Sequence, residues 1–147
     1  MKKILVLILT ICMLPIFANA QTKVKKGSVP KTIRTTYLKA NSKGKKAQWY
    51  KQGSDYMADY NGTQHRYTSG GKLVWTLKKL SDNAIPSSVK SAYSTKYNAE
   101  YPLQAAKEAT LANGQKYTFM IGQKQGNNYY FKYDSNGVMV EKTSTNK

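Results

Sequence analysis

The sequence predicts an α+β protein in which two tandem repeats form one sheet with both helices on one face, each repeat being a helix followed by a four-stranded antiparallel meander. Three observations predict this fold. The segment 85–97, "IPSSVKSAYSTKY", repeats a weaker copy, "VPKTIRTTYLK", that begins 56 residues earlier at Val29. After each copy the apolar period changes from that of a helix to that of a strand. Turn signals containing glycine then separate the short runs.

Each copy has the features of a helix start. Pro30 and Pro86 suit the first turn of a helix, where their fixed φ fits and their missing N–H has no partner to lose. Thr32, Thr35 and Thr36 lower the helix propensity of the first copy, so its helix should depend on packing. The apolar stripes predicted to pack are Ile33, Tyr37 and Ala40 in the first copy and Val89, Ala92, Tyr93 and Tyr97 in the second.

Alternation with a period of two predicts half-buried strands in "SDYMADY", "KLVWTLKK", "KYTFMI" and "NYYFKY". Asn61-Gly62 predicts a type I′ hairpin turn, because both residues tolerate positive φ. Further turns are expected at Gly70-Gly71, at Asn113-Gly114 and in "DSNG" from Asp134. The aromatic residues that periodicity assigns to the core are Tyr37, Trp75, Tyr93, Tyr117, Phe119 and Phe131.

The first twenty residues are typical of a secretory signal peptide, with two lysines, an apolar stretch and small residues at positions 18 and 20. Cys12, the one cysteine, lies inside it, so disulfides and thiol chemistry are not expected after cleavage. The protein should be periplasmic or secreted. Residues 21–28 are expected to be a flexible basic leader, followed by a single domain, 29–147, made of repeats 29–80 and 85–142.

The positive charge is concentrated in the first half of the chain. Without the signal peptide, 22 basic residues stand against 7 acidic ones. Residues 21–80 carry 14 of the basic residues and 2 of the acidic ones. An anionic partner is therefore expected on that side, unless the lysines serve only solubility.

Several residues resemble a known family. "PKTIRTTY" from Pro30, "IPSSVKSAY" from Ile85, the Tyr101-Pro102 pair and the closing "YFKYDSNGVMV" are similar to the PepSY-like repeats of bacterial exported proteins related in shape to beta-lactamase inhibitor protein (BLIP). The first repeat departs from the pattern, since it carries "NSKGKKAQWYK" in place of a Tyr-Pro pair. The resemblance implies a helix-backed sheet with one open, often concave face and a tendency to bind or inhibit other envelope proteins. It carries over no catalytic residue.

No candidate catalytic site emerges from the remaining residues. His65, the one histidine, has no visible partner for general-base or metal chemistry, so a structural or surface role is expected. Asp55 and Asp59 would lie about 13 Å apart on one strand, too far for a glycosidase pair. Asp134 starts a run that lacks the later acids of a calcium loop, so it should cap a turn closed by Gly137. The protein is not expected to be an enzyme or to hold a metal or cofactor.

The sequence leaves two binding hypotheses. In the first, the sheet face opposite the helices binds a cell-envelope protein or inhibits a cell-envelope enzyme. Its predicted binding residues are Met57, Arg66, Lys78, Lys116, Met120, Tyr130 and Lys132. In the second, the basic first repeat binds anionic envelope polymer, lipid head groups or nucleic acid, although export makes nucleic acid the weaker choice. The residues predicted for that role are Lys23, Lys25, Lys26, Lys43, Lys45 and Lys46.

Overall fold

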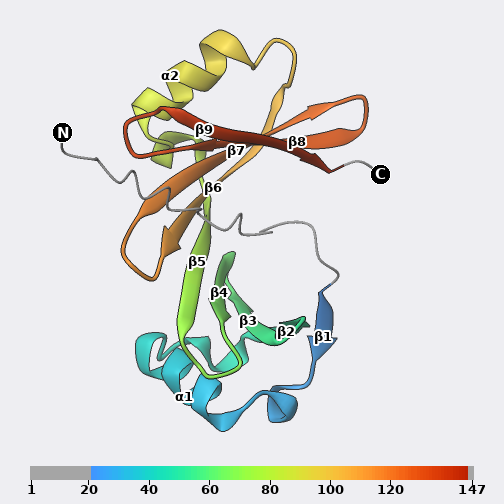
Figure 1. The fold of residues 1–147 in the computed structure, drawn as a ribbon, viewed down its shortest axis with the longest axis vertical. Coiled ribbons are helices and arrows are strands. Elements are labelled where there is room, and N and C mark those ends of the chain that lie inside the picture. The colour runs from blue at the N-terminus through green and yellow to red at the C-terminus, as the bar shows by residue number, and fades with distance from the viewer. Residues whose placement is uncertain (1–20, 146–147) are drawn as a thin grey trace, which may run out of the picture.

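A computed structural model describes residues 21–145, so the predicted signal peptide and Cys12 lie outside the described residues. The chain forms one open antiparallel sheet of nine strands, adjacent in the sheet in their chain order (Figure 1). The strands are β1 (Thr22–Val24), β2 (Gln48–Gln52), β3 (Asp55–Tyr60), β4 (Thr63–Tyr67), β5 (Leu73–Leu80), β6 (Leu103–Leu111), β7 (Lys116–Lys124), β8 (Asn127–Tyr133) and β9 (Met139–Thr145). The α+β class and the single sheet are confirmed.

Two α-helices precede the two groups of four strands. They are α1 (Lys31–Ala40), before β2, and α2 (Ser87–Lys96), between β5 and β6; short 3-10 helices occur at Lys26–Ser28 (η1), Gly44–Lys46 (η2) and Asp82–Ala84 (η3). Pro30 and Pro86 stand one residue before the helices rather than in the first turn, because their ψ values of 138° and 133° are still extended. Within residues 21–145, neither helix is long and apolar enough to cross a membrane.

The strand register shows which side of the sheet the helices cover. On β5, Thr76 pairs with His65 and Leu80 pairs with Ala106. Thr76 and Leu80 are four residues apart on one strand, so they face the same side. The Tyr37 ring of α1 lies edge-on to His65 at 5.4 Å between centroids, and α2 packs in one cluster with Ala106. Both helices therefore cover the same face, which we call the helix face.

Two core clusters lie between the helices and the sheet. Ile33 and Tyr37 are the buried residues of α1, and Val89 and Tyr93 are those of α2. The predicted stripes are therefore confirmed at these positions, whereas Ala40 at the end of α1 is exposed. The sheet residues buried with α1 are Trp49, Ala58 and Tyr67, and those buried with α2 are Ala106, Met120, Phe131 and Tyr133.

A tyrosine docks each helix onto a glycine. A Cβ added to Gly122 on β7 would lie 2.2 Å from Oη of Tyr93 and 2.7 Å from the carbonyl oxygen of Tyr101. The Tyr93 hydroxyl donates a hydrogen bond to that carbonyl, and burial raises the pKa of Tyr93 to about 12, so it stays protonated as a donor. Tyr37 approaches Gly44 as closely, since a Cβ there would lie 2.3 Å from its Oη, but Gly44 belongs to η2 beside α1 and not to the sheet.

Residues 21–28 were expected to be a flexible leader, and the structure places them within the fold. Thr22–Val24 is strand β1, which pairs with β2 through Lys23 opposite Tyr50 and Val24 opposite Trp49. Val24 is partly buried and packs against the α1 cluster. The contact of Val24 with the α1 cluster and the otherwise unpaired edge of β2 explain why this segment forms a strand. Its polar composition alone does not predict one.

The turns follow the predicted chemistry closely. Asn61 and Gly62 have φ of 50° and 73°, as a type I′ turn requires. Oδ1 of Asp134 accepts hydrogen bonds from the backbone N–H groups of Asn136 and Val138, both at 2.9 Å, and Gly137 has a φ of 82°. The turn at Gln125-Gly126 also has two positive φ values, 51° and 78°, although it has no Asn-Gly signal.

His65 lies on the helix face under α1, which agrees with a structural role. It is about half-buried, its Nδ1 lies 3.3 Å from Oγ1 of Thr76, and its ring contacts Tyr37. Burial lowers the pKa of His65 below its ordinary value of 6.5. The folded protein therefore holds the neutral imidazole in preference to the charged form.

We expect Gly122→Ala to lower the free energy of unfolding by about 1–3 kcal/mol, because the new methyl group cannot fit against Tyr93 and the Tyr101 backbone. Urea denaturation measures this as a lower midpoint. Gly27→Ala is the matched control, since nothing lies within 4 Å of its Cβ position. Equal midpoints for the two variants would show that Tyr93 does not need the space at Gly122.

We expect the protein to lose stability as the pH falls from about 6.5, where unfolded histidine gains a proton, through the lower folded pKa of His65. The unfolded chain binds that proton first, so acid favours unfolding. Thermal melts at pH 7.5 and pH 5.5 should differ more for the wild type than for His65→Gln, which carries no titrating ring. A pH dependence that is the same in both proteins would contradict the burial of a neutral imidazole.

Candidate functional site

The sheet face opposite the helices, which we call the open face, carries a third apolar cluster. Its buried members are Met57, Trp75, Leu77, Ala109, Tyr117 and Phe119, and its partly buried members are Tyr50, Val74 and Leu111. No residue of α1 or α2 belongs to it. In register, Tyr50 pairs with Met57, and Trp75 pairs with Leu111, so the cluster crosses the sheet from β2 to β7.

Basic side chains surround this apolar cluster. Lys79 on β5 pairs with Lys107 on β6, Lys107 pairs with Phe119, and Phe119 pairs with Lys132 on β8. Nζ of Lys132 lies 4.1 Å from the centroid of the Tyr117 ring, a cation–π geometry. The open face therefore joins a rigid aromatic platform to a row of cations.

Four of the seven residues predicted for the binding face lie on the open face. These are Met57, Arg66, Tyr130 and Lys132. Met57 is 1% exposed, so it is a buried member of the apolar cluster and does not lie at the exposed edge of that cluster. Tyr130, which pairs with Ile121, is partly exposed.

The other three predicted residues, Lys78, Lys116 and Met120, are on the helix face, so this part of the prediction is wrong. Met120 is fully buried under α2, paired with Ala106 and Phe131. Lys78 and Lys116 are exposed, and Nζ of Lys116 lies 3.3 Å from Oε1 of Glu108.

The error has two physical causes. A bulge leaves Val74 unpaired, since Arg66 pairs with Trp75 and Tyr67 pairs with Leu73, and this reverses the face of β5 after Leu73. Strand β7 is buried on both faces from Tyr117 to Gly122, so its sequence has no alternation of apolar and polar residues that could show which side chains face the helices.

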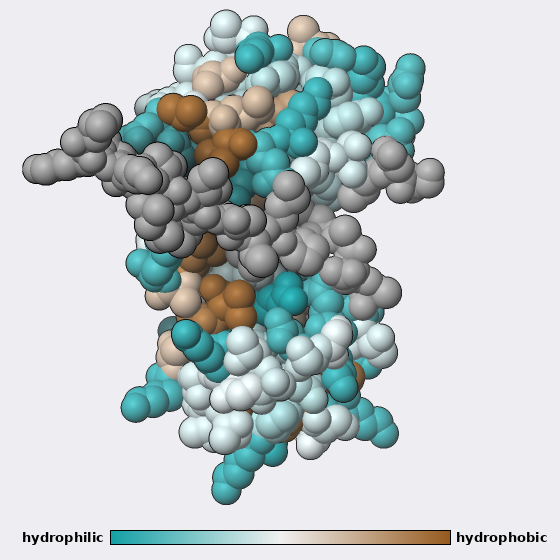
Figure 2. All heavy atoms as spheres, in the orientation of Figure 1, coloured by the Kyte–Doolittle hydropathy of each residue, from teal (hydrophilic) through white to brown (hydrophobic). Residues whose placement is uncertain are grey.

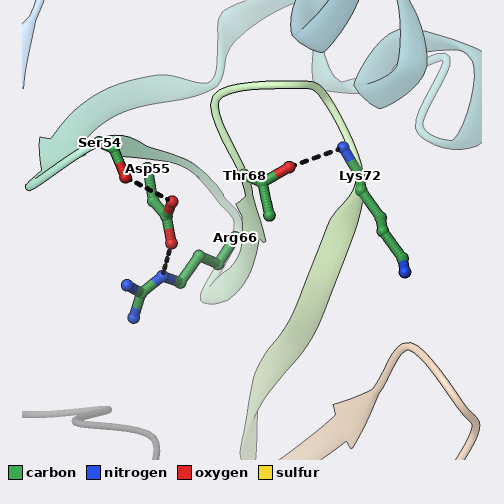
Figure 3. A network of polar contacts seen from close by, with 5 residues as sticks. All are labelled: Ser54, Asp55, Arg66, Thr68 and Lys72. Atoms are coloured by element: carbon green, nitrogen blue, oxygen red, sulfur yellow. Dashed lines mark hydrogen bonds and ion pairs between the residues drawn. The ribbon is translucent and has the colours of Figure 1, made fainter.

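Arg66 and Asp55 form an ion pair at one end of the open face. Nε of Arg66 donates to Oδ2 of Asp55 at 2.9 Å, and their side chains are 13% and 19% exposed. Figure 3 shows the Asp55 carboxylate between Arg66 and the Ser54 hydroxyl, which donates to it at 3.3 Å. The same view shows Thr68 closing the β4–β5 turn by accepting from the backbone N–H of Lys72. Asp55 therefore accepts from both Arg66 and Ser54 in the folded protein.

A pocket of about 140 Å³ opens on this face between β3 and β6. It is lined by Asp59, Gly62, Gln64, Leu77, Lys79 and Lys107. Nε2 of Gln64 donates to Oδ2 of Asp59 at 2.9 Å. Burial lowers the pKa of Lys107, the positive charge of Lys79 lowers it further, and Asp59 opposes both effects. The pocket thus holds two cations against one carboxylate.

The residues that sequence reasoning missed are Trp75, Tyr117 and Phe119, which were assigned to the helix-side core, and the pair Lys79 and Lys107. The alternation of Asp59, Gln64 and Lys79 with apolar residues gave only a weak signal for the pocket. Their meeting depends on the pairing of β5 with β6, two strands separated by the whole of α2.

The six lysines predicted to bind an anionic surface are all exposed. Nζ of Lys26 donates to the carbonyl oxygen of Lys45 at 3.2 Å, so the run at 25–26 meets the run at 43–46 beside α1. We call Lys25, Lys26, Lys43, Lys45 and Lys46 the basic patch. Lys23 lies apart, on the open-face side of β1 opposite Tyr50. None of the six forms an ion pair with an acidic residue in the described part of the chain.

Metal and acid–base chemistry find little support in residues 21–145. No group of three or more histidine, cysteine, aspartate or glutamate side chains in that range could hold a metal ion. Asp55 is paired with Arg66, Asp59 accepts from Gln64, and His65 faces α1 on the other side of the sheet.

No protein-family model matches the chain, and no curated protein matches it significantly. Solved structures do match. A DUF2874 family protein from Bacteroides ovatus is 18% identical with a TM-score of 0.70, over 78% of this chain and 86% of that one. A proposed periplasmic protein from Bacteroides eggerthii is 15% identical with a TM-score of 0.72, over 79% and 88% of the two chains.

A BLIP-like protein from Bacteroides fragilis also matches, with 14% identity and a TM-score of 0.67, over 78% of this chain and 85% of that one. Identities this low establish the fold and nothing further. The chain therefore has a BLIP-like fold, as the resemblance to BLIP-related proteins implied, whereas membership of the PepSY family stays a prediction.

Proposed function

We propose that this protein is an exported, non-catalytic module that binds a protein partner in the bacterial cell envelope through the open face of its sheet. The observation that carries the proposal is the apolar cluster on the face that neither helix covers, bordered by Arg66, Lys79, Lys107 and Lys132. The periplasmic description of one structural neighbour and the BLIP-like fold of another support it.

The composition of the open face suits a protein partner. Aromatic and arginine side chains are enriched where protein interfaces concentrate their binding energy. The partly exposed apolar residues, Tyr50, Val74 and Leu111, lie beside the rigid platform of Trp75. Figure 2 shows, in one view, apolar residues in small patches between hydrophilic ones.

Inhibition of an envelope enzyme is a narrower form of the same proposal. The BLIP-like protein among the neighbours motivates it. A partner identified through the open face should then lose activity when this protein is added in excess.

The two halves of the chain are, we propose, diverged copies of one PepSY-like repeat. The 56-residue spacing supports this, as does the matching order of a helix with a buried tyrosine, Tyr37 or Tyr93, followed by four antiparallel strands. The copies differ in their charge, which suggests that the first has acquired a role of its own.

That role is a second candidate function: the basic patch attaches the protein to an anionic polymer or lipid surface. The contact between Lys26 and Lys45 favours it, because two lysine runs that are far apart in sequence become one exposed cluster. Attraction of this kind should be strongly screened by salt.

For the open face, we expect the double variant Tyr130→Ala/Lys132→Glu to lose partners that the wild type captures from envelope extract, because it removes a rim aromatic and reverses a rim charge. Quantitative mass spectrometry of the captured proteins measures the loss. Lys78→Glu is the matched control, since Lys78 is exposed on the helix face. Identical partner lists for all three proteins would exclude the outer part of the open face as the binding surface.

For the basic patch, we expect the affinity for anionic lipid vesicles or for heparin to fall by roughly 10-fold or more between 50 and 200 mM salt. Lys43→Gln, Lys45→Gln and Lys46→Gln combined should weaken binding more than the same change at Lys72, Lys78 and Lys96. These three control lysines are also exposed, so the loss of charge is equal. Equal weakening by both sets would mean that only net charge acts, and salt-independent binding would refute the attachment role.

A further inference from the structure

Strand β5 carries, on the open face, two places where residues with hydrogen-bond donors are paired directly across neighbouring strands. One is the pocket beside Lys79, and the other is Trp75, four residues earlier on the same strand. Both side chains point to the same face because four residues are an even number of steps along a strand. The donors at the pocket are two lysine side chains, and those at the second place are buried N–H groups.

At the pocket, two lysines face each other across neighbouring strands. Lys79 and Lys107 are directly paired in the register of β5 and β6. Like charges directly opposite each other are destabilising in a sheet, and an anion between them would reverse that effect. Burial is the main cause of the lowered pKa of Lys107, and the nearby charge of Lys79 lowers it further. With Asp59 in the wall, the lining keeps one net positive charge, which suits one carboxylate better than a doubly charged phosphate.

At the other place, two donors lack acceptors. Arg66 and Trp75 are directly paired across β4 and β5. Nη1 of Arg66 and Nε1 of Trp75 are buried and have no hydrogen-bond partner in the described part of the chain. Trp75 is 1% exposed. The ion pair with Asp55 uses Nε of Arg66 and not Nη1. A buried donor without an acceptor costs free energy that an incoming oxygen would remove. The 13% exposure of the Arg66 side chain gives such an oxygen a point of entry.

The spacing of the two places fits one extended chain. Four residues of β5 span about 13 Å at strand rise. Residues i and i+4 of an extended segment that lies along β5 are separated by the same distance and point to the same side. A helical segment would place the same two residues only about 6 Å apart.

We propose that the open face binds an extended, acidic segment of its protein partner, with one carboxylate between Lys79 and Lys107 and a second acidic oxygen at Arg66 and Trp75. This rests on the proposed function of the open face and adds the chemistry of the partner. Asp59, already engaged by Gln64, lies beside the first carboxylate and limits the pocket to a single negative charge.

The test uses a capped peptide, GEGSGEG, in which two glutamates are four residues apart, and its uncharged counterpart GQGSGQG. Binding is followed by NMR through the indole N–H of Trp75, distinguished from that of Trp49 by a Trp49→Phe variant. We expect GEGSGEG to shift the Trp75 signal and to bind at least about tenfold more tightly than GQGSGQG. The combined variant Lys79→Gln/Lys107→Gln should weaken GEGSGEG by about tenfold, whereas Lys78→Gln, on the opposite face of the same strand, should not.

Three outcomes would overturn the proposal. The two peptides bind equally, or the Trp75 signal does not move at 10 mM GEGSGEG, which is about the excess that a weak site needs. The third is that the Lys79→Gln/Lys107→Gln variant binds GEGSGEG as tightly as the wild type does. Tighter binding of a single-stranded oligothymidylate than of GEGSGEG would overturn it in favour of a polyanion site. The amide spectrum of each variant checks its folding. If GEGSGEG does not bind while Tyr130→Ala/Lys132→Glu still loses its captured partners, the acidic segment is refuted and the open face stands. If neither test gives an effect, both proposals fail.

Discussion

The docking of a helix tyrosine onto a glycine is the constraint on which the rest of the structure depends. Tyr93 brings α2 so close to Gly122 of β7, and Tyr37 brings α1 so close to Gly44 of η2, that a single methyl group on either glycine would collide. Both tyrosines are 1% exposed, so each docking buries a large aromatic side chain. Because both tyrosines also pack in the clusters between the helices and one side of the sheet, they determine which face is covered and which is left for a partner.

The central strands must then be apolar on both faces. Strand β7 buries Met120 beneath α2 and Phe119 on the open face, one residue apart. Strand β5 passes between the part of the sheet near α1 and the part near α2 (Figure 1). The open face thus gains a rigid apolar platform from the same strands that complete the helix-side core, and its binding properties come from the side chains at the rim.

Charge on this protein has two distinct arrangements. In the basic patch, lysines from 25–26 and 43–46 gather in solvent, where attraction to any polyanion is strong and weakly selective. On the open face, Lys79, Lys107 and Arg66 stand in register beside aromatic rings, where a carboxylate must reach a defined position. The first arrangement suits attachment to a surface, and the second suits recognition of one partner.

The sequence alone determined the local features: the two helices after Pro30 and Pro86, the Asn61-Gly62 turn and the Asp134 turn. These depend on neighbouring residues, whose chemistry is visible in a short stretch. The tertiary structure decided the face of Trp75, Phe119 and Met120, because the bulge at Val74 and the two-sided burial of β7 remove the alternation signal. It also decided the incorporation of β1 and the meeting of Lys79 with Lys107, since strand pairing joins residues through backbone hydrogen bonds that no local pattern records.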